Sequence, residues 1–130
     1  MQSKLIISID KIQKNWESIN QLSNLKASAV VKANAYGFGT IEIVKALVKK
    51  GCDFFYVAHF EEAIELRKKL QLNNFKIAAF EGMIHEANDY KAYRIIPILN
   101  NLVQLNKLNQ YNNQNPTKPL KGILNFDTGM

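Results

Sequence analysis

The sequence predicts an α/β fold in which the strands of a parallel sheet are joined by crossover helices. Short apolar runs rich in β-branched residues recur along the chain, and amphipathic helical patterns separate them. Each strand–helix unit takes about 20–25 residues, the length of a right-handed parallel crossover. The chain of 130 residues has room for one domain. Both a small open sheet and part of a (β/α) barrel satisfy this pattern.

The first unit begins with an extended segment at 5–10, LIISID. Asp10 is a residue type that caps helices, so we expect a helix to start there. Its apolar side chains, Ile12, Trp16 and Ile19, are spaced four and three apart and therefore share one face.

The second unit begins with SAVVK at 28–32, a run typical of a strand buried on both faces. A glycine-containing loop follows and ends at Thr40, which we expect to be a helix N-cap. The helix expected at 41–50 has two lysines at its C-terminal end, where they suit the helix dipole, and Gly51 closes it.

The rest of the chain repeats this alternation. Helices are predicted at 61–70 and 101–111, and the segment at 81–90 receives no element. Further strands are predicted at 54–58, 76–80, 95–99 and 120–126, which makes five in all.

Composition excludes several classes of protein. The net charge is +6, but only Arg67 and Arg94 are arginines and the lysines are scattered, so we expect a solvated basic surface rather than a nucleic-acid site. No apolar run reaches the roughly 18 residues that span a membrane. Cys52 is the only cysteine, which fits a reducing cytoplasm, and we expect it to be a buried small residue. His59 and His85 have no ligands at metal spacing along the sequence, so no metal site is predicted.

Ligands of parallel α/β sheets bind at the carboxyl ends of the strands, where Lys32 stands out. It ends an apolar strand, so its amine is either desolvated and available as a nucleophile or extended into water from the rim. Tyr36 follows four residues later, in the loop. Its phenol could donate a hydrogen bond to a phosphate or simply cap the end of the sheet.

The decapeptide VVKANAYGFG at 30–39 resembles the pyridoxal-phosphate attachment segment of the alanine racemase family, VVKANAYGHG, at nine of ten positions. Four later segments resemble the family's strands and helices in the same order. They are FYVAHFEEAIELRK at 55–68, IAAFEG at 77–82, IPILNNLVQL at 96–105 and FDTGM at 126–130.

The resemblance implies a (β/α)8 TIM-type barrel followed by a C-terminal β domain, assembled as a homodimer. Residues 1–130 would form the N-terminal portion of the barrel, about five strands with their crossover helices, and the C-terminal domain would be absent. The implied reaction interconverts L-alanine and D-alanine for peptidoglycan synthesis, with pyridoxal 5′-phosphate as cofactor.

The resemblance also assigns roles to four residues. Lys32 would form the Schiff base with the cofactor and act as the base on the D-alanine side. Tyr36 would hydrogen-bond the cofactor phosphate, and Phe80 would lie beside the cofactor ring. Met130 would meet the substrate carboxylate through its backbone, across the dimer interface.

The sequence also departs from the family pattern. Phe38 replaces a histidine, and Asn125 stands where many members have a lysine. The arginine that follows the Asp-Thr-Gly-Met segment and the tyrosine base of the opposite face are not in this sequence. We therefore expect a truncated racemase that is inactive alone. The alternative is a non-enzymatic remnant or interaction fragment that needs a complementary chain.

Overall fold

Five short parallel strands form the centre of the structure, a computed structural model that describes residues 3–23, 27–72 and 74–129. Each strand pairs with the next one along the chain, in the order β1-β2-β3-β4-β5. This sequential parallel order is that of a barrel wall, whereas a doubly wound sheet reverses its order at a switch point. The strands are β1 (Ala29–Val30), β2 (Phe54–Val57), β3 (Lys76–Ala79), β4 (Ile95–Leu99) and β5 (Ile123–Leu124).

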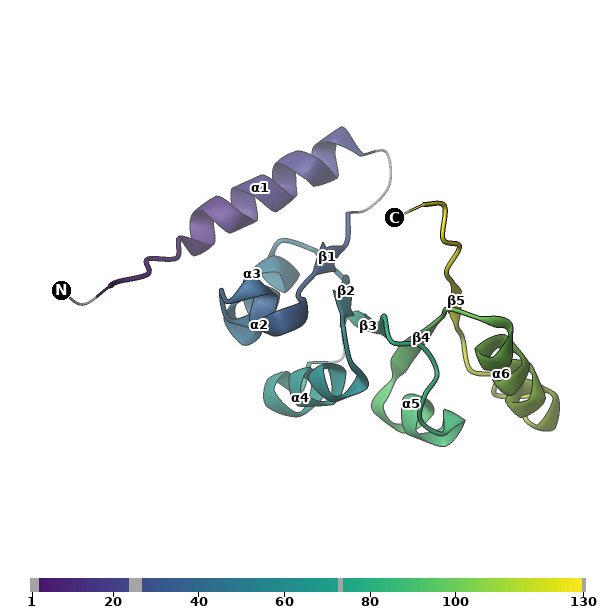
Figure 1. The fold of residues 1–130 in the computed structure, drawn as a ribbon. Helices are drawn as coiled ribbons and strands as arrows, with labels where there is room; N and C mark the ends of the chain where they lie inside the picture. The colour runs from purple at the N-terminus through teal and green to yellow at the C-terminus, as the bar shows by residue number, and fades with distance from the viewer. Residues whose placement is uncertain (1–2, 24–26, 73, 130) are drawn as a thin grey trace.

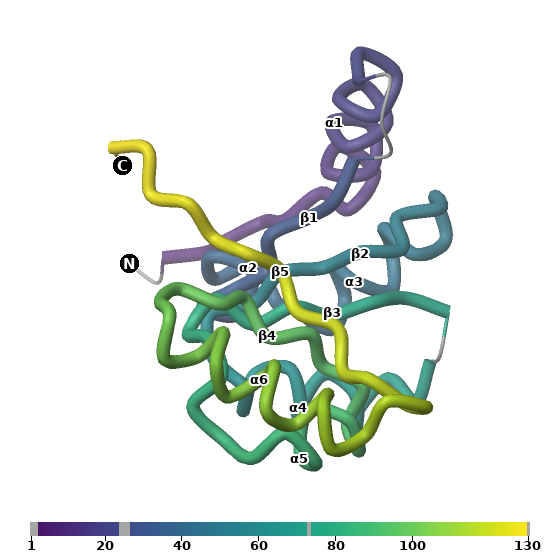
Figure 2. The backbone as a smooth tube through the Cα atoms, turned by 90° about the vertical axis from the view of Figure 1, so that its right-hand side faces the viewer, coloured from purple at the N-terminus to yellow at the C-terminus, as the bar shows by residue number. Residues whose placement is uncertain are grey.

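The helices follow the outside of the curved sheet. Figure 1 shows α3 to α6 along one side of the strands, while no helix of the described part covers the other side. Helix α1 packs against α3 at one end of this row: Gln13 of α1 donates to the carbonyl oxygen of Ala46 in α3 at 2.8 Å, and Figure 2, turned by 90°, shows α1 projecting beyond the sheet. The helices are α1 (Ile9–Leu22), α2 (Lys32–Tyr36), α3 (Thr40–Lys49), α4 (Phe60–Leu70), α5 (Ala87–Tyr93) and α6 (Leu102–Gln114).

The core lies between the sheet and this row of helices. In β2 and β3, Phe55 pairs with Ile77 and Val57 with Ala79, and all four side chains are fully buried. Their neighbours alternate toward the uncovered face, as the two-residue period of a strand requires. The helices complete the core with buried apolar side chains, which include Val44, Leu47, Ala63, Leu66 and Tyr90.

The first helix starts earlier than predicted. It begins at Ile9, and the N-cap is Ser8, whose Oγ accepts a hydrogen bond from the backbone N–H of Lys11 at 3.4 Å. Asp10 is therefore not the cap but lies in the first turn, where its charge still suits the dipole. Trp16 is the buried residue of this helix, while Ile19 is 59% exposed.

The first strand is shorter than the predicted 28–32 and is not buried on both faces. Val31 is 2% exposed, but Val30 is 42% exposed because its side of the sheet has no covering layer in the described structure. Thr40 is not the N-cap either. Gly39 takes that position, and Thr40, the first helical residue, donates its hydroxyl to the carbonyl oxygen of Val31 at 3.1 Å.

The later elements confirm the predicted alternation and differ in length. The segment at 81–90 contains most of α5, a helix that the sequence pattern did not indicate. The last strand, β5, is much shorter than the predicted 120–126. Cys52 is buried, as predicted. Within the described ranges, no helix combines the length and apolar character required to cross a bilayer.

Candidate active site

The carboxyl ends of the strands bring two of the predicted site residues together. Lys32 follows β1, and Phe80 follows β3. The Nζ atom of Lys32 lies 5.9 Å from the centroid of the Phe80 ring, and Phe80 is 40% exposed. A cation at this distance is attracted by the negative face of the ring. This arrangement sets a primary amine beside an exposed flat surface, so it fits an aromatic aldehyde such as pyridoxal phosphate.

Lys32 is half-buried. Its surroundings are therefore intermediate between the two that the sequence allowed, a desolvated amine and an amine extended into water. Ion pairs with carboxylates are found in the described chain for Lys45, Lys50, Lys69 and Lys107, but not for Lys32. The amine of Lys32 is therefore held against an aromatic ring without a carboxylate within 4.0 Å among the described residues.

The ring of Phe80 continues into a row of aromatic side chains on the uncovered face. Phe80 stacks on Tyr56 with 5.5 Å between ring centroids, and Tyr56 stacks on Phe54 at 4.8 Å. Sequence reasoning missed Tyr56 as a site residue. The alternation of FFYV carried the signal, because Phe54 and Tyr56 share one face of a strand.

The segment after Lys32 forms a left-handed helical turn. Residues Ala33, Asn34, Ala35 and Tyr36 all have φ between 51° and 55°. This conformation costs roughly 1–2 kcal/mol per residue for side chains other than glycine, so neighbouring contacts must hold it. One such contact is the hydrogen bond from the backbone N–H of Thr40 to Asn34 Oδ1 at 3.0 Å.

The left-handed turn places the side chain of Tyr36 beside different residues from those that contact Lys32. Tyr36 is 62% exposed and lines a small hollow with Ile12 of α1 and Phe38. Its predicted contact with a cofactor phosphate stays a prediction. Met130, the predicted substrate contact, lies outside the described residues.

Glu62 of α4 connects the two segments that end at the site. One of its carboxylate oxygens accepts hydrogen bonds from the backbone N–H groups of Ala58 and His59, at 2.7 and 3.2 Å. The other accepts the N–H of Ala33 at 2.8 Å. Sequence reasoning read this glutamate only as part of the acidic start of a helix. The signal was its position three residues after the N-cap, which is that of a capping box.

A relay of side-chain amides holds the other side of the site. Asn100 donates to the carbonyl oxygen of Phe80 at 2.7 Å, and Asn125 donates to Asn100 Oδ1 at 3.0 Å. These two hydrogen bonds connect the backbone carbonyl of Phe80 to the residues that follow β4 and β5. Asn125, noted in the sequence as a departure from the family, is one member of this relay.

A second cluster of charged residues lies at the start of α4. His59 Nδ1 and Glu81 are 2.8 Å apart, and this hydrogen bond raises the pKa of His59 above its usual value. Glu61, Glu81 and His85 also have ligand atoms within 4.8 Å of one another, a proximity that the sequence spacing concealed. Both oxygens of Glu81 already bond His59 and the backbone of Phe60. The absence of a metal site stays a prediction.

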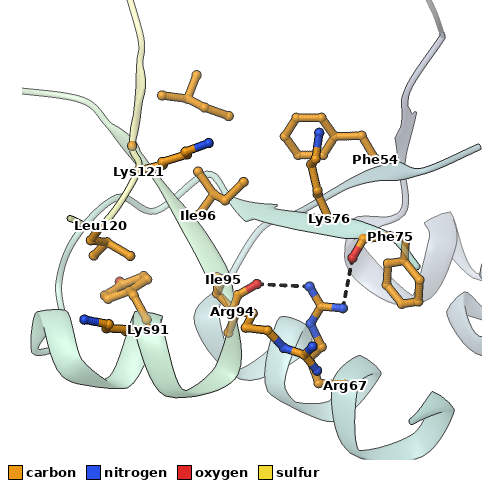
Figure 3. Close-up of a pocket in the computed structure, with 13 residues that line it drawn as sticks. Phe54, Arg67, Phe75, Lys76, Lys91, Arg94, Ile95, Ile96, Leu120 and Lys121 are labelled. Atoms are coloured by element: carbon orange, nitrogen blue, oxygen red, sulfur yellow. Dashed lines mark hydrogen bonds between the residues drawn. The ribbon is translucent and has the colours of Figure 1, made fainter. Parts of the chain in front are cut away.

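A pocket of about 560 Å³ lies at the opposite, amino end of the strands, and none of the predicted site residues lines it. Figure 3 shows Arg67 donating to the carbonyl oxygens of Arg94 and Phe75, at 3.0 and 3.1 Å. Burial, with a smaller effect of the nearby Arg94 charge, lowers the pKa of Arg67 to about 10. Arg67 thus joins α4 to the starts of two strands.

The fold and site together define a class: a (β/α)-barrel chain with a half-buried lysine at the end of its first strand. The family model described as "Alanine racemase, N-terminal domain" matches residues 7–130. The chain therefore belongs to the alanine racemase family.

Relatives and solved structures agree with this assignment. The alanine racemase of Rickettsia prowazekii (strain Madrid E) is 40% identical over 102 residues, covering 77% of this chain and 25% of that protein. That of Rickettsia bellii (strain RML369-C) is 44% identical over 82 residues, 62% of this chain and 20% of the relative. The crystal structure of the Bartonella henselae alanine racemase, with covalently bound pyridoxal phosphate, has a TM-score of 0.77 and 36% identity. It covers 86% of this chain and 32% of that one. This chain thus spans about a quarter of the length of the curated relatives it matches.

Proposed function

We propose that this chain is the cofactor-attaching part of a pyridoxal-phosphate-dependent alanine racemase, with Lys32 as the residue that bonds the cofactor. One observation carries the proposal: the amine of Lys32 follows β1 and lies 5.9 Å from the exposed ring of Phe80. Pyridoxal phosphate, when bound, supplies an electron-withdrawing ring that makes the α-proton of an amino acid removable.

The residues of this chain have three tasks in such a reaction. Lys32 holds or moves a proton at Nζ on one face of the amino acid. Phe80 offers a flat apolar surface and keeps water away from one side of the amine. Tyr36 donates a hydrogen bond from its hydroxyl to the phosphate. The base of the other face must come from outside residues 1–130, and so must the arginine that follows the Asp-Thr-Gly-Met segment.

Three further features of the whole protein belong to the same proposal. Its product, D-alanine, serves peptidoglycan synthesis. Two subunits assemble, and Met130 meets the substrate carboxylate across their interface. The protein works in the cytoplasm, where its single, buried cysteine stays reduced.

The test is reconstitution from two chains. The second chain carries the remaining length of the Rickettsia prowazekii racemase, and the mixture receives pyridoxal phosphate and L-alanine. We expect D-alanine to form only when both chains are present and only when Lys32 is intact. Formation of D-alanine by the 130-residue chain alone would overturn the expectation that it is incomplete. Equal activity of a Lys32→Ala mixture would overturn the role of Lys32.

The second candidate function is a non-enzymatic interaction fragment that needs a complementary chain. It is favoured by the apolar side chains that the uncovered face exposes, such as Val30 and Phe80. In the same experiment, two chains that co-elute as a stable complex without forming D-alanine would support this candidate over the enzyme.

A further inference from the structure

The carboxylate of Glu62 makes more contacts than a helix cap requires. A capping box uses one side-chain oxygen to accept the backbone N–H of the N-cap residue, here His59. The same oxygen also accepts the N–H of Ala58. The second oxygen leaves the helix and reaches the N–H of Ala33, 29 residues earlier in the chain.

Ala33 begins the left-handed segment of the backbone. Val31 has φ of −126°, and Ala33 is the first non-glycine residue with φ in the left-handed region. The bond from Glu62 therefore holds the first peptide after Lys32, on which the direction of the lysine side chain depends. The other bonds of the turn include those from Ala35 to Val31, from Gly37 to the carbonyl oxygen of Ala33 and from Thr40 to Asn34, and none of them uses the N–H of Ala33.

We propose that Glu62 is a positioning residue for Lys32: its carboxylate fixes the backbone at Ala33 so that the lysine amine stays over Phe80. The inference rests on the proposed function of Lys32 as the cofactor-bonding residue. Glu62 acts through the backbone, because its carboxylate accepts the amides of Ala33, Ala58 and His59, and no ion pair with Lys32 is found among the described residues. Hydrogen bonds to a charged acceptor are the stronger kind, and this one joins two strand–helix units.

Three variants of the 130-residue chain separate positioning from general stability. Glu62→Ala removes both acceptors. Glu62→Gln keeps the size of the side chain and one acceptor oxygen. It should therefore disturb Ala33 and Lys32 less than Glu62→Ala does, and it should remain folded even if Glu62→Ala does not. Glu65→Gln is the matched control, since it lies on the same helix and loses the same charge. Glu65 is exposed, and in the described part of the chain its carboxylate pairs with Lys69.

Two measurements are made on each variant. The first is hydrogen exchange at the backbone amide of Ala33. The second is the yield of pyridoxal phosphate trapped on Lys32 by borohydride reduction and located by mass spectrometry, relative to the other lysines. We expect exchange to be about tenfold faster in Glu62→Ala and less accelerated in Glu62→Gln, as the loss of one charge-assisted hydrogen bond implies. The relative yield on Lys32 should fall in the same order, and Glu65→Gln should match the wild type in both.

The outcomes distinguish this inference from the proposed function. Unchanged exchange at Ala33 in both Glu62 variants would overturn the positioning role, whatever the trapping shows. Unchanged trapping on Lys32 beside faster exchange would overturn it too, because the turn would then move without moving the amine. A wild-type chain that takes no label on Lys32 would overturn the proposed function instead. In that case, faster exchange in the Glu62 variants would still support the conclusion that Glu62 stabilises the backbone beside Lys32.

Discussion

At the scale of single residues, the site is a lysine placed by its neighbours. The sequence predicted Lys32 and Phe80 because each ends an apolar strand and because both lie in segments that resemble a known family. It did not predict Glu62, Tyr56 or Asn100. Their roles depend on which strand–helix units lie side by side, and the spacing of residues along the chain does not contain that information.

The ion pair between His59 and Glu81 gives a pH-dependent prediction. His59 binds its proton more tightly in the folded chain than in the unfolded one, because its pKa is raised by the bond to Glu81. The pair therefore stabilises the fold fully below the unfolded pKa of about 6.5, and the stabilisation is lost as the pH rises through the folded value. We expect His59→Gln to lower the melting temperature more at about pH 5.5 than at about pH 8.5.

A matched substitution checks this interpretation by thermal unfolding. Glu42→Gln breaks the exposed ion pair with Lys45, which contains no histidine. It should therefore show the same small effect at both pH values. An equal decrease in the melting temperature of His59→Gln at both pH values would contradict the proposed role of the His59 charge.

At the scale of elements, the left-handed turn of α2 is the main departure from the predicted structure. The sequence indicated a loop at NAYGFG, and its glycines were the only sign of unusual backbone. Four consecutive residues other than glycine adopt positive φ there. No local propensity favours this, so the surrounding contacts decide it. Such strain often marks a functional segment.

The strain predicts an unusual response to glycine. Ala33 is exposed with φ of 51°, so Ala33→Gly should remove strain without opening a cavity and raise the free energy of unfolding by up to about 1 kcal/mol. The same change at Ala92, exposed within α5, should lower the free energy of unfolding by about 0.5–1 kcal/mol. Urea denaturation measures both, and a loss of stability at Ala33 would show that the turn is not strained.

The loop before α5 gives a second prediction at this scale. Tyr90 is fully buried, and its hydroxyl donates to the carbonyl oxygen of Gly82 at 2.7 Å and accepts the N–H of Ile84 at 3.2 Å. Tyr90→Phe keeps the ring but leaves both backbone groups without this partner. We expect a loss of about 1–3 kcal/mol in the free energy of unfolding. Tyr93→Phe, on the same helix, is the control and should cost less.

At the scale of the whole molecule, the alternation of strands and helices was enough to predict the class of fold. The order β1-β2-β3-β4-β5 and the single row of helices follow from right-handed crossovers between neighbouring strands. The exposed face of the sheet was not predicted. Periodicity marked SAVVK as buried on both sides, but burial of the inner face requires strands that are not among the five described.

The two edge strands lead to a prediction about stability. Both β1 and β5 have two residues and lie at the ends of the strand order, so each pairs with one neighbouring strand among the described residues and leaves its outer edge to another partner. A second chain carrying the remaining barrel strands should cover these edges and the apolar face. We expect the melting temperature of the 130-residue chain to rise with the concentration of that second chain, as binding to the folded state requires. A melting temperature independent of its concentration would contradict this account.

The most direct test of the central claim is to find where pyridoxal phosphate attaches. The wild-type chain is incubated with the cofactor, reduced with borohydride and digested, and the added mass is located by mass spectrometry. The account predicts label concentrated on Lys32 and lost in Lys32→Ala, while Lys45→Ala, which removes an exposed lysine, keeps it. Label spread evenly over the lysines, or an unchanged total in Lys32→Ala, would contradict the account.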